Sequence, residues 1–232
     1  MLILAIDTTS SAGSVALLRD LDVVSQVASA DAEPYSTRLF RDVERVMHDA
    51  GMRMPDIELF AVASGPGSFT GVRVGLAAVK AWAEVYRKPV APVSALEAIA
   101  FQAASSDSLI AGIADAHRGQ LFAGLYQRAE YGMSRRGEDV VMPPAECFAY
   151  LAEQAEGAPF VIRTTAAQVV QTALVGSPAA GARVDAADPA LAPVIGKLAY
   201  ARALRGDVVD ALTLDAHYVR RSDAELLWHD HS

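Results

Sequence analysis

Residues 65–75 read Gly-Pro-Gly-Ser-Phe-Thr-Gly-Val-Arg-Val-Gly, and this stretch decides the fold. The apolar residues 59–63 before it are typical of a buried strand. Residues 76–86 after it contain neither Pro nor Gly and predict a helix. The stretch is therefore a strand-to-helix turn. Gly65 and Gly67 free the backbone of the turn, and Ser68 or Thr70 can cap the helix.

This turn has two interpretations. The N–H groups at a helix N-terminus attract phosphate, which makes Gly65, Gly67 and Ser68 candidate phosphate contacts. Alternatively, the glycines only tighten the turn and let the helix pack close to the sheet. The spacing matches neither the P-loop, which ends in Gly-Lys-Ser/Thr, nor the dinucleotide-binding fingerprint. The turn taken alone favours the packing interpretation.

Composition narrows the function classes. The chain has 232 residues, enough for one large domain or two small ones, with 52% hydrophobic and 21% charged residues. A formal charge of −8 argues against a protein that binds nucleic acid on its own through electrostatic attraction. The single cysteine, Cys147, excludes an internal disulfide and a cysteine-based zinc site. No signal peptide or membrane span is predicted, so the expected location is cytoplasmic.

The chain opens with a predicted β-hairpin. Residues 2–6 and 14–18 are apolar strands, and residues 23–28 can form a third. The turn between the first two carries the further phosphate-loop candidates Asp7, Thr8, Thr9 and Ser10. A carboxylate and hydroxyls at this place are the layout of the first phosphate loop in the actin-like ATPase and sugar-kinase fold. The same residues can also just satisfy the backbone of a turn, and the local pattern does not separate the two.

Two helices of the first half differ in their apolar surface. Residues 36–49 show one apolar stripe, and Arg38 lies among the polar residues of the other side. The helix after the glycine turn is apolar most of the way round, which predicts burial on several sides. One side faces the sheet. The other needs a neighbouring helix of this chain or another protein, and the pattern favours neither.

The rest of the chain repeats the order of strands followed by helices. Ser94 to Glu97 form a capping box that starts a helix ending near residue 104, and residues 105–108 are the predicted domain boundary. The expected units are residues 1–104, residues 105–225 and a tail, 226–232. In the second unit we expect strands at 109–114, 121–126, 137–142 and 160–162, helices at 143–156, 165–175 and 193–205, a surface loop at 176–189 and an extended segment at 217–221.

No constellation of side chains predicts catalysis or a metal site. The five histidines form no helical His-x-x-x-His pair, and no Gly-x-Ser-x-Gly elbow is present. Asp7, Glu97 and Asp115 could each act as a general base, but their isolation favours structural roles. We therefore predict no catalytic residue and no metal ligand.

Five segments in order carry a resemblance to a known family. They are residues 2–9, the turn at 65–75, Ser94-Ala95-Leu96-Glu97-Ala98, Asp115-Ala116-x-Arg118 and Tyr218-Val219-Arg220. Together they resemble the TsaB (YeaZ) family of bacteria over residues 1–225. The resemblance implies an α/β protein of the actin-like ATPase (ASKHA) fold, with two subdomains that each have a mixed sheet flanked by helices. It also implies a role in forming threonylcarbamoyladenosine beside the tRNA anticodon.

The resemblance further implies partners. TsaB-like proteins pair with TsaD, a catalytic paralogue of the same fold, and with the ATPase TsaE, so this chain is expected to be a non-catalytic subunit that meets tRNA only through the complex. The first two helices of the family pack against those of TsaD. The interface candidates, divided between core and partner surface, are Leu39, Val43, Met47, Val72, Leu76, Val79 and Trp82. Alone, such a surface predicts a homodimer.

The resemblance also bears on cofactors. TsaD-like sequences carry Asn-His-x-Glu-Gly-His, whose histidines hold a metal, where this chain has Ala95 and Ile99. Neither side chain can bind a metal, so a TsaD-type centre cannot form there. No cofactor is predicted for the chain itself, and ATP or ADP at the interface of the complex stays open. The alternative functions are a stand-alone nucleotide-dependent kinase or ATPase and, with little support, a peptidase.

Overall fold

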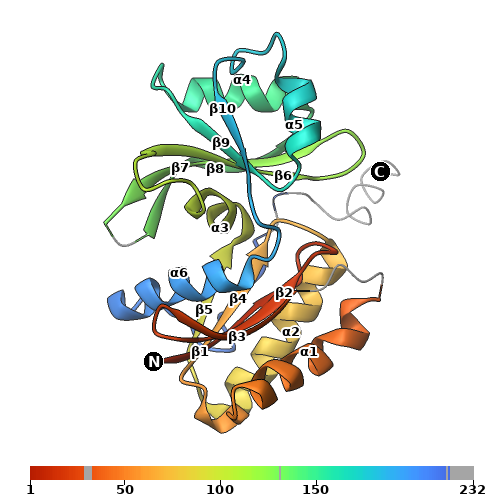
Figure 1. The fold of residues 1–232 in the computed structure, drawn as a ribbon, viewed down its shortest axis with the longest axis vertical. Helices are drawn as coiled ribbons and strands as arrows, with labels where there is room; N and C mark the ends of the chain where they lie inside the picture. Colours follow the sequence, from red (N-terminus) through yellow and green to blue (C-terminus); the bar gives the residue numbers. More distant parts are fainter. Residues whose placement is uncertain (29–32, 131, 218, 220–232) are drawn as a thin grey trace, which may run out of the picture.

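The chain folds around two five-stranded mixed sheets (Figure 1). The computed structural model describes residues 1–28, 33–130, 132–217 and 219. The first sheet has the order β3-β2-β1-β4-β5, with β1 (Leu2–Asp7), β2 (Ser14–Arg19), β3 (Asp22–Ala28), β4 (Leu59–Gly65) and β5 (Val90–Ser94). The second has the order β10-β9-β6-β7-β8, with β6 (Leu109–Asp115), β7 (Leu121–Ala129), β8 (Gly132–Met142), β9 (Val161–Thr164) and β10 (Arg183–Ala186). Two mixed sheets flanked by helices confirm the predicted fold class.

The centre of the first sheet is buried on both faces, because residues 2–6 of β1 and 59–63 of β4 are unbroken apolar runs. The two strands pair in parallel, and every residue of each is buried. Leu4 and Ile6 point to α1 (Tyr35–Asp49) and α2 (Phe69–Tyr86). Ile3 and Ala5 point to the opposite face, which α3 (Ala95–Phe101) and α6 (Ala192–Arg205) cover. The alternation of side chains along one strand thus builds two separate cores.

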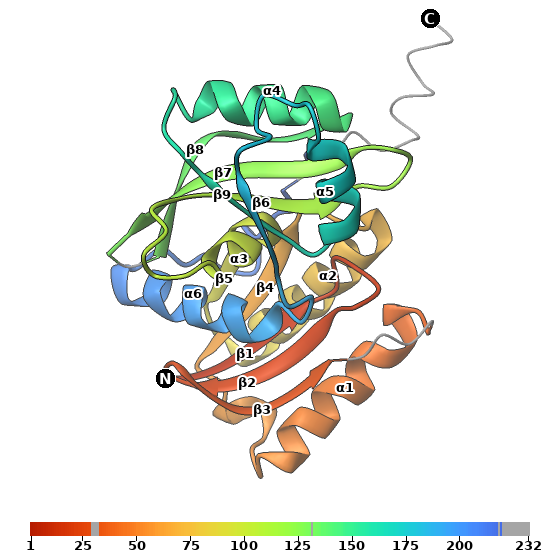
Figure 2. The ribbon, with the colours of Figure 1, turned by 45° about the horizontal axis from the view of Figure 1, so that its top comes forward.

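The second sheet shares one of these cores. Its outer face packs on α4 (Pro144–Gln154) and α5 (Ala167–Leu174) through residues such as Phe148 and Val170. Its inner face contributes Ile110, Phe122 and Tyr126 to the same cluster as Ile3 and α3. Figures 1 and 2 both show α3 between the two sheets. We call the sheet of β1–β5 with α1, α2 and α6 the first lobe, and the sheet of β6–β10 with α4 and α5 the second.

Three sequence expectations need correction. First, residues 193–205 were expected in the second unit, but α6 packs on β1, β2, β4 and β5 of the first sheet, because its apolar side, which includes Ile195 and Ala199, completes that core. Second, the expected loop 176–189 contains the short edge strand β10, parallel to β9. Third, α2 begins at Phe69, so the last two glycines of the turn lie inside the helix.

Some expectations fall outside the described residues. These are Tyr218 and Arg220 of the resemblance, most of the extended segment 217–221, and the tail at 226–232. Across the described part of the chain, no helix is long and apolar enough to cross a membrane.

Candidate functional site

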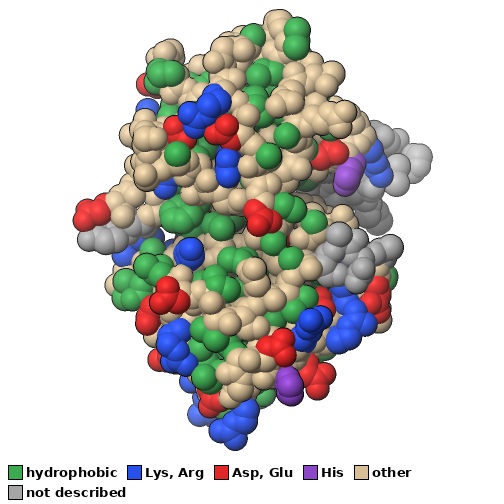
Figure 3. All heavy atoms as spheres, in the orientation of Figure 1, with side chains coloured by type: hydrophobic (Ala, Val, Ile, Leu, Met, Phe, Trp, Pro, Cys, Tyr) green, Lys and Arg blue, Asp and Glu red, His purple; other side chains and the backbone are tan. Residues whose placement is uncertain are grey.

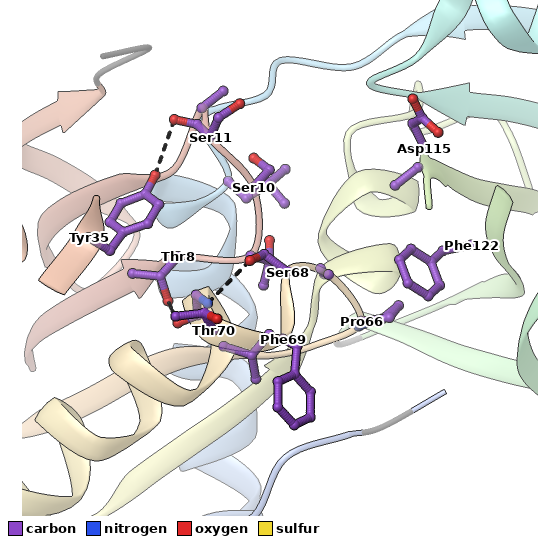
Figure 4. Close-up of a pocket in the computed structure, with 18 of the residues that line it drawn as sticks. Thr8, Ser10, Ser11, Tyr35, Pro66, Ser68, Phe69, Thr70, Asp115 and Phe122 are labelled. Carbon is purple, nitrogen blue, oxygen red and sulfur yellow. Dashed lines mark hydrogen bonds between the residues drawn. The ribbon is translucent and has the colours of Figure 1, made fainter. Parts of the chain in front are cut away.

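A cleft of about 1130 Å³ lies between the two lobes. The first lobe lines it with the β1–β2 loop, the glycine turn and the start of α1, and the second lobe with residues around Asp115, Phe122 and Thr165. Figure 4 shows Ser10, Ser11 and Ser68 on one side of this cleft and Asp115 with Phe122 on the other. The phosphate-loop candidates from two distant parts of the sequence therefore meet here.

The carboxylate of the β1–β2 loop is turned inward. Asp7 is fully buried, and its Oδ1 accepts hydrogen bonds from the backbone N–H of Thr9 at 2.9 Å and from the Thr9 hydroxyl at 2.6 Å. Its other oxygen, Oδ2, has no hydrogen-bond partner among the described residues. Burial raises the pKa of Asp7 from 3.8 to about 6, and the two bonds from Thr9 partly oppose this shift. Asp7 thus holds the turn in shape and does not line the cleft.

The glycine turn packs directly on the same loop. The Ser68 N–H donates to the Thr9 carbonyl at 2.7 Å, and the Thr8 hydroxyl donates to the Gly71 carbonyl at 2.7 Å. Ser68 caps α2, because its hydroxyl accepts from the Gly71 N–H. A Cβ on Gly67 would lie 2.4 Å from the Thr9 carbonyl oxygen, and one on Gly71 would lie 2.0 Å from that of Thr8. The glycines are needed for close packing, and the N–H of Ser68 and the carbonyl of Gly71 bond to the β1–β2 loop.

Two residues that the sequence patterns missed close the other side of the loop. Arg38 is only 1% exposed, and its guanidinium donates to the Ser11 carbonyl at 3.0 Å and stacks 4.1 Å from the centre of the Tyr35 ring. The Tyr35 hydroxyl also donates to the Ser11 carbonyl (Figure 4). Helical periodicity placed Arg38 on the solvent side. The informative feature was Gly13, whose absent Cβ leaves room for the Tyr35 hydroxyl.

The wall from the second lobe is a tight turn between β6 and β7. Asp115 accepts a hydrogen bond from the His117 N–H at 2.7 Å. His117, Arg118 and Gly119 have φ angles of 58°, 54° and 74°, so the chain makes three left-handed residues in succession. Asp115 therefore stabilises a turn, as its isolation in the sequence suggested, and the turn carries His117 at the rim of the cleft.

The interface candidates are distributed unevenly between core and surface. Trp82 is half-buried, stacked on Phe60 with ring centres 6.2 Å apart, and meets the edge of Phe40 at 5.7 Å. The other six are at most 6% exposed and belong to the core beneath α1 and α2: Leu39, Val43, Met47, Val72, Leu76 and Val79. A partner cannot reach them in this fold, so those six belong to the core.

A different row of side chains is exposed on the same two helices. On α2 it consists of Phe69, Arg73, Ala77, Ala81 and Val85, and on α1 it includes Phe40. Phe40 on α1 is 59% exposed and Val85, one residue before the end of α2, is 71% exposed, high values for large apolar side chains. We call these six residues the exposed row.

Ala95 and Ile99, which stand where TsaD-like sequences have metal-binding histidines, lie on α3. Ala95 and Ile99 are buried in the core shared by the two sheets. Within the part of the chain that the structure describes, no three His, Cys, Asp or Glu residues lie close enough to hold a metal ion.

The raised pKa of Asp7 gives a testable dependence of stability on pH. Between pH 3.8 and about 6 the native state binds more protons at Asp7 than the unfolded state, so its contribution to stability falls as pH rises through this window. Asp7→Asn stays neutral and can still accept both bonds from Thr9. We expect the free energy of unfolding of the variant, relative to the native sequence, to rise by about 3 kcal/mol across the window. Urea unfolding at several pH values measures it, and parallel profiles for the two proteins would contradict it.

The sequence matches a family model and several curated proteins. A family model described as "TsaD: tRNA N6-adenosine threonylcarbamoyltransferase" matches residues 23–183. The tRNA threonylcarbamoyladenosine biosynthesis protein TsaB of Bacillus subtilis (strain 168) is 39% identical over 127 residues, 55% of this chain and 56% of that protein. The TsaB protein of Escherichia coli (strain K12) is 35% identical over 136 residues, 57% of this chain and 58% of that one. The chain thus spans little more than half the length of these curated relatives.

Solved structures extend the likeness to nearly the whole chain. YeaZ from Pseudomonas aeruginosa is similar with a TM-score of 0.80 and 27% identity, covering 94% of this chain and 99% of that one. A ROK hexokinase from Thermus thermophilus has a TM-score of 0.51 at 13% identity, covering 89% of this chain and 100% of that one. At that identity the likeness concerns the fold alone.

Proposed function

Because the chain belongs to the TsaD family, and within it to the TsaB/YeaZ group, we propose that it is a non-catalytic partner subunit in the formation of threonylcarbamoyladenosine. In this proposal the chain binds a TsaD-type catalytic paralogue and supports its reaction at the adenosine beside the tRNA anticodon. A TsaE-type ATPase and the tRNA join through that complex. The observation that carries the proposal is the exposed row on α1 and α2.

The exposed row has the chemistry of a helix-docking surface. Phe40 and Val85 supply large apolar side chains, and the exposed Ala77 and Ala81 on α2 are small enough for the backbone of a partner helix to approach. Arg73 lies over the Phe69 ring at 3.6 Å and marks a polar end of the row. An apolar centre with a charged margin is the usual anatomy of a protein interface. A paralogue of the same fold has two equivalent helices to offer.

The site also supports a non-catalytic role. The two loops that could hold phosphate are bonded to each other through Ser68, Thr8 and Thr9. Ala95 and Ile99 offer no metal ligand on α3. On the face in Figure 3, basic and acidic side chains are interspersed, with no basic patch, in keeping with a subunit that meets tRNA through its partners.

Reconstitution tests the proposal. Purified TsaC, TsaD and TsaE are combined with tRNA, threonine, bicarbonate and ATP, with and without this chain, and the modified nucleoside is counted by mass spectrometry. We expect product only when this chain is present, together with co-elution of the chain with TsaD in size-exclusion chromatography. Equal product without the chain and no co-elution would refute the partner role.

The cleft favours a second candidate, a nucleotide-dependent kinase or ATPase. Its volume admits a nucleotide, and the buried Arg38 at its wall offers a cation. In the first proposal, ATP or ADP binds only in the complex, where the partner completes the site. Calorimetric titration of the isolated chain and of the complex with magnesium and ATP separates the two. Tight binding and turnover by the isolated chain would favour the second candidate.

A further inference from the structure

A second polar cluster lies on the other side of α3, outside the cleft loops. Its centre is Asp139 of β8, whose side chain is fully buried. The carboxylate accepts from the Tyr126 hydroxyl at 2.8 Å and from the Ser94 hydroxyl at 3.4 Å, and it lies 3.0 Å from Nε2 of His217. Arg135 approaches it at 3.7 Å.

The members of this cluster come from both lobes. Asp139, Tyr126 and Arg135 belong to the second sheet, and Ser94 is the last residue of β5 in the first. His217 belongs to a segment that runs along the first lobe, where Val209 bridges to Val90. The His217 N–H donates to the Ser64 carbonyl at 2.8 Å, so its backbone is fixed to β4 of the first sheet while its imidazole contacts the second.

The backbone is shaped to make room for this carboxylate. A Cβ on Gly124 of β7 would lie 2.2 Å from Oδ1 of Asp139 and 2.9 Å from the Tyr126 ring. The cluster also satisfies its own charges, since Arg135 pairs with Asp139, and Arg202 pairs with Glu97 at the start of α3. A cavity of about 420 Å³ adjoins it and is also lined by Asp215, whose carboxylate accepts a hydrogen bond from the Ala216 N–H at 2.7 Å. The cluster is built to join the lobes.

The cluster and the covalent connections between the lobes lie at opposite ends of α3. The chain crosses between the lobes at residues 102–108 and 187–191, and both crossings meet at the C-terminal end of α3. There the Gln102 amide donates to the Asp188 carbonyl at 3.1 Å, and the Asp188 N–H donates to the Gln102 side chain at 2.8 Å. The Asp139 cluster sits at the N-terminal end of α3, where Ser94 caps that helix. Rotation of one lobe about the crossings would pull on this opposite end.

We propose that Asp139 and His217 form an interlobe clamp that fixes the opening of the cleft. With both contacts in place, the two lobes are held at both ends of α3 and keep one relative orientation. Without the His217 contact, the described residues keep the crossings, the core around α3 and the weaker contacts of the Ser94 hydroxyl with Asp139 and Tyr126, and the cleft samples wider openings. His217 lines both the cleft and the smaller cavity, so the clamp stands at the boundary between them.

Distances between spin labels measure the opening in the full chain. Labels are attached to Leu21→Cys in the exposed β2–β3 turn of the first lobe and to Glu153→Cys on α4 of the second. The natural Cys147 is buried and stays unlabelled. We expect His217→Ala and Gly124→Ala to broaden the distance distribution and shift it to longer distances. His217→Gln, whose amide can donate to Asp139, should keep the distribution of the native sequence.

Matched controls separate the clamp from general loosening. His117→Ala removes an exposed histidine at the rim of the cleft, and Gly181→Ala adds a Cβ that meets no atom within 4 Å. Both controls should leave the distribution unchanged, and circular dichroism verifies that every variant is folded. An unchanged distribution in His217→Ala would overturn the proposal, whatever Gly124→Ala does. Equal broadening in the two controls would overturn it as well.

Discussion

Replacing Ala77 with Glu is expected to weaken binding of a TsaD-type partner by about 100-fold while the chain stays folded. Ala77 is exposed at the middle of α2, and burying an unpaired carboxylate in an interface costs roughly 3 kcal/mol, or two factors of ten. Within the helix the new carboxylate has Arg73 four residues before it and Lys80 three residues after it. Both neighbours are favourable, so the free variant should retain its stability.

Titration calorimetry of each variant against the partner measures this loss. Ala149→Glu is the matched control, because Ala149 is exposed in the middle of α4, on the other lobe. It should bind as the native sequence does. Leu76→Glu serves as a different control: this residue belongs to the core, so its variant should unfold rather than lose binding selectively. Full affinity in Ala77→Glu would remove the exposed row as the docking surface.

Replacing Gly71 with Ala is expected to lower the free energy of unfolding by about 3 kcal/mol. Helix propensity alone predicts the opposite sign, since Ala is favoured over Gly in a helix interior by about 1 kcal/mol. The added methyl, however, would lie 2.0 Å from the Thr8 carbonyl oxygen, which is backbone and cannot rotate away. Either α2 or the β1–β2 loop must move, and the bond from the Thr8 hydroxyl to the Gly71 carbonyl is strained or lost.

Urea denaturation followed by circular dichroism measures the change. Gly181→Ala is again the control, because its Cβ meets open space and its effect should stay near zero. The sign of the change in the free energy of unfolding decides between the two effects. A more stable Gly71→Ala would mean that the turn has room for a methyl group and that packing does not require glycine there.

The strands and the main helices were predictable because each depends on local pattern. The apolar runs at residues 2–6 and 59–63 are typical of buried strands, and the Ser94 box marked the start of α3. The glycine turn was predictable as a turn, and the sequence already favoured packing over phosphate binding. The structure shows this packing in the close approach of Gly67 and Gly71 to the backbone of Thr8 and Thr9, and phosphate binding by the turn stays a prediction.

What the sequence could not show depends on contacts between distant segments. Periodicity put Arg38 on the polar side of its helix, yet the carbonyl of Ser11, 27 residues earlier, holds it in a buried position. Because α2 is apolar on most of its sides, its sequence did not show which residues are buried and which belong to the exposed row. Val72 and Val85 are the same residue type, yet Val72 is buried under neighbouring elements and Val85 is exposed. Asp139 and His217 are 78 residues apart and share no motif.

Because α6 packs on the first sheet, the first lobe can be completed only late during synthesis on the ribosome. Strands β1, β2, β4 and β5 emerge early, but the helix that covers one of their faces emerges about a hundred residues after β5. At a synthesis rate of about 5–20 residues per second, that face of the sheet lacks α6 for on the order of 5–20 s. The second lobe, from β6 to β10, is contiguous in sequence and can fold before α6 emerges. We expect the nascent first lobe to bind chaperones during this interval, although its sheet precedes the second lobe in the sequence.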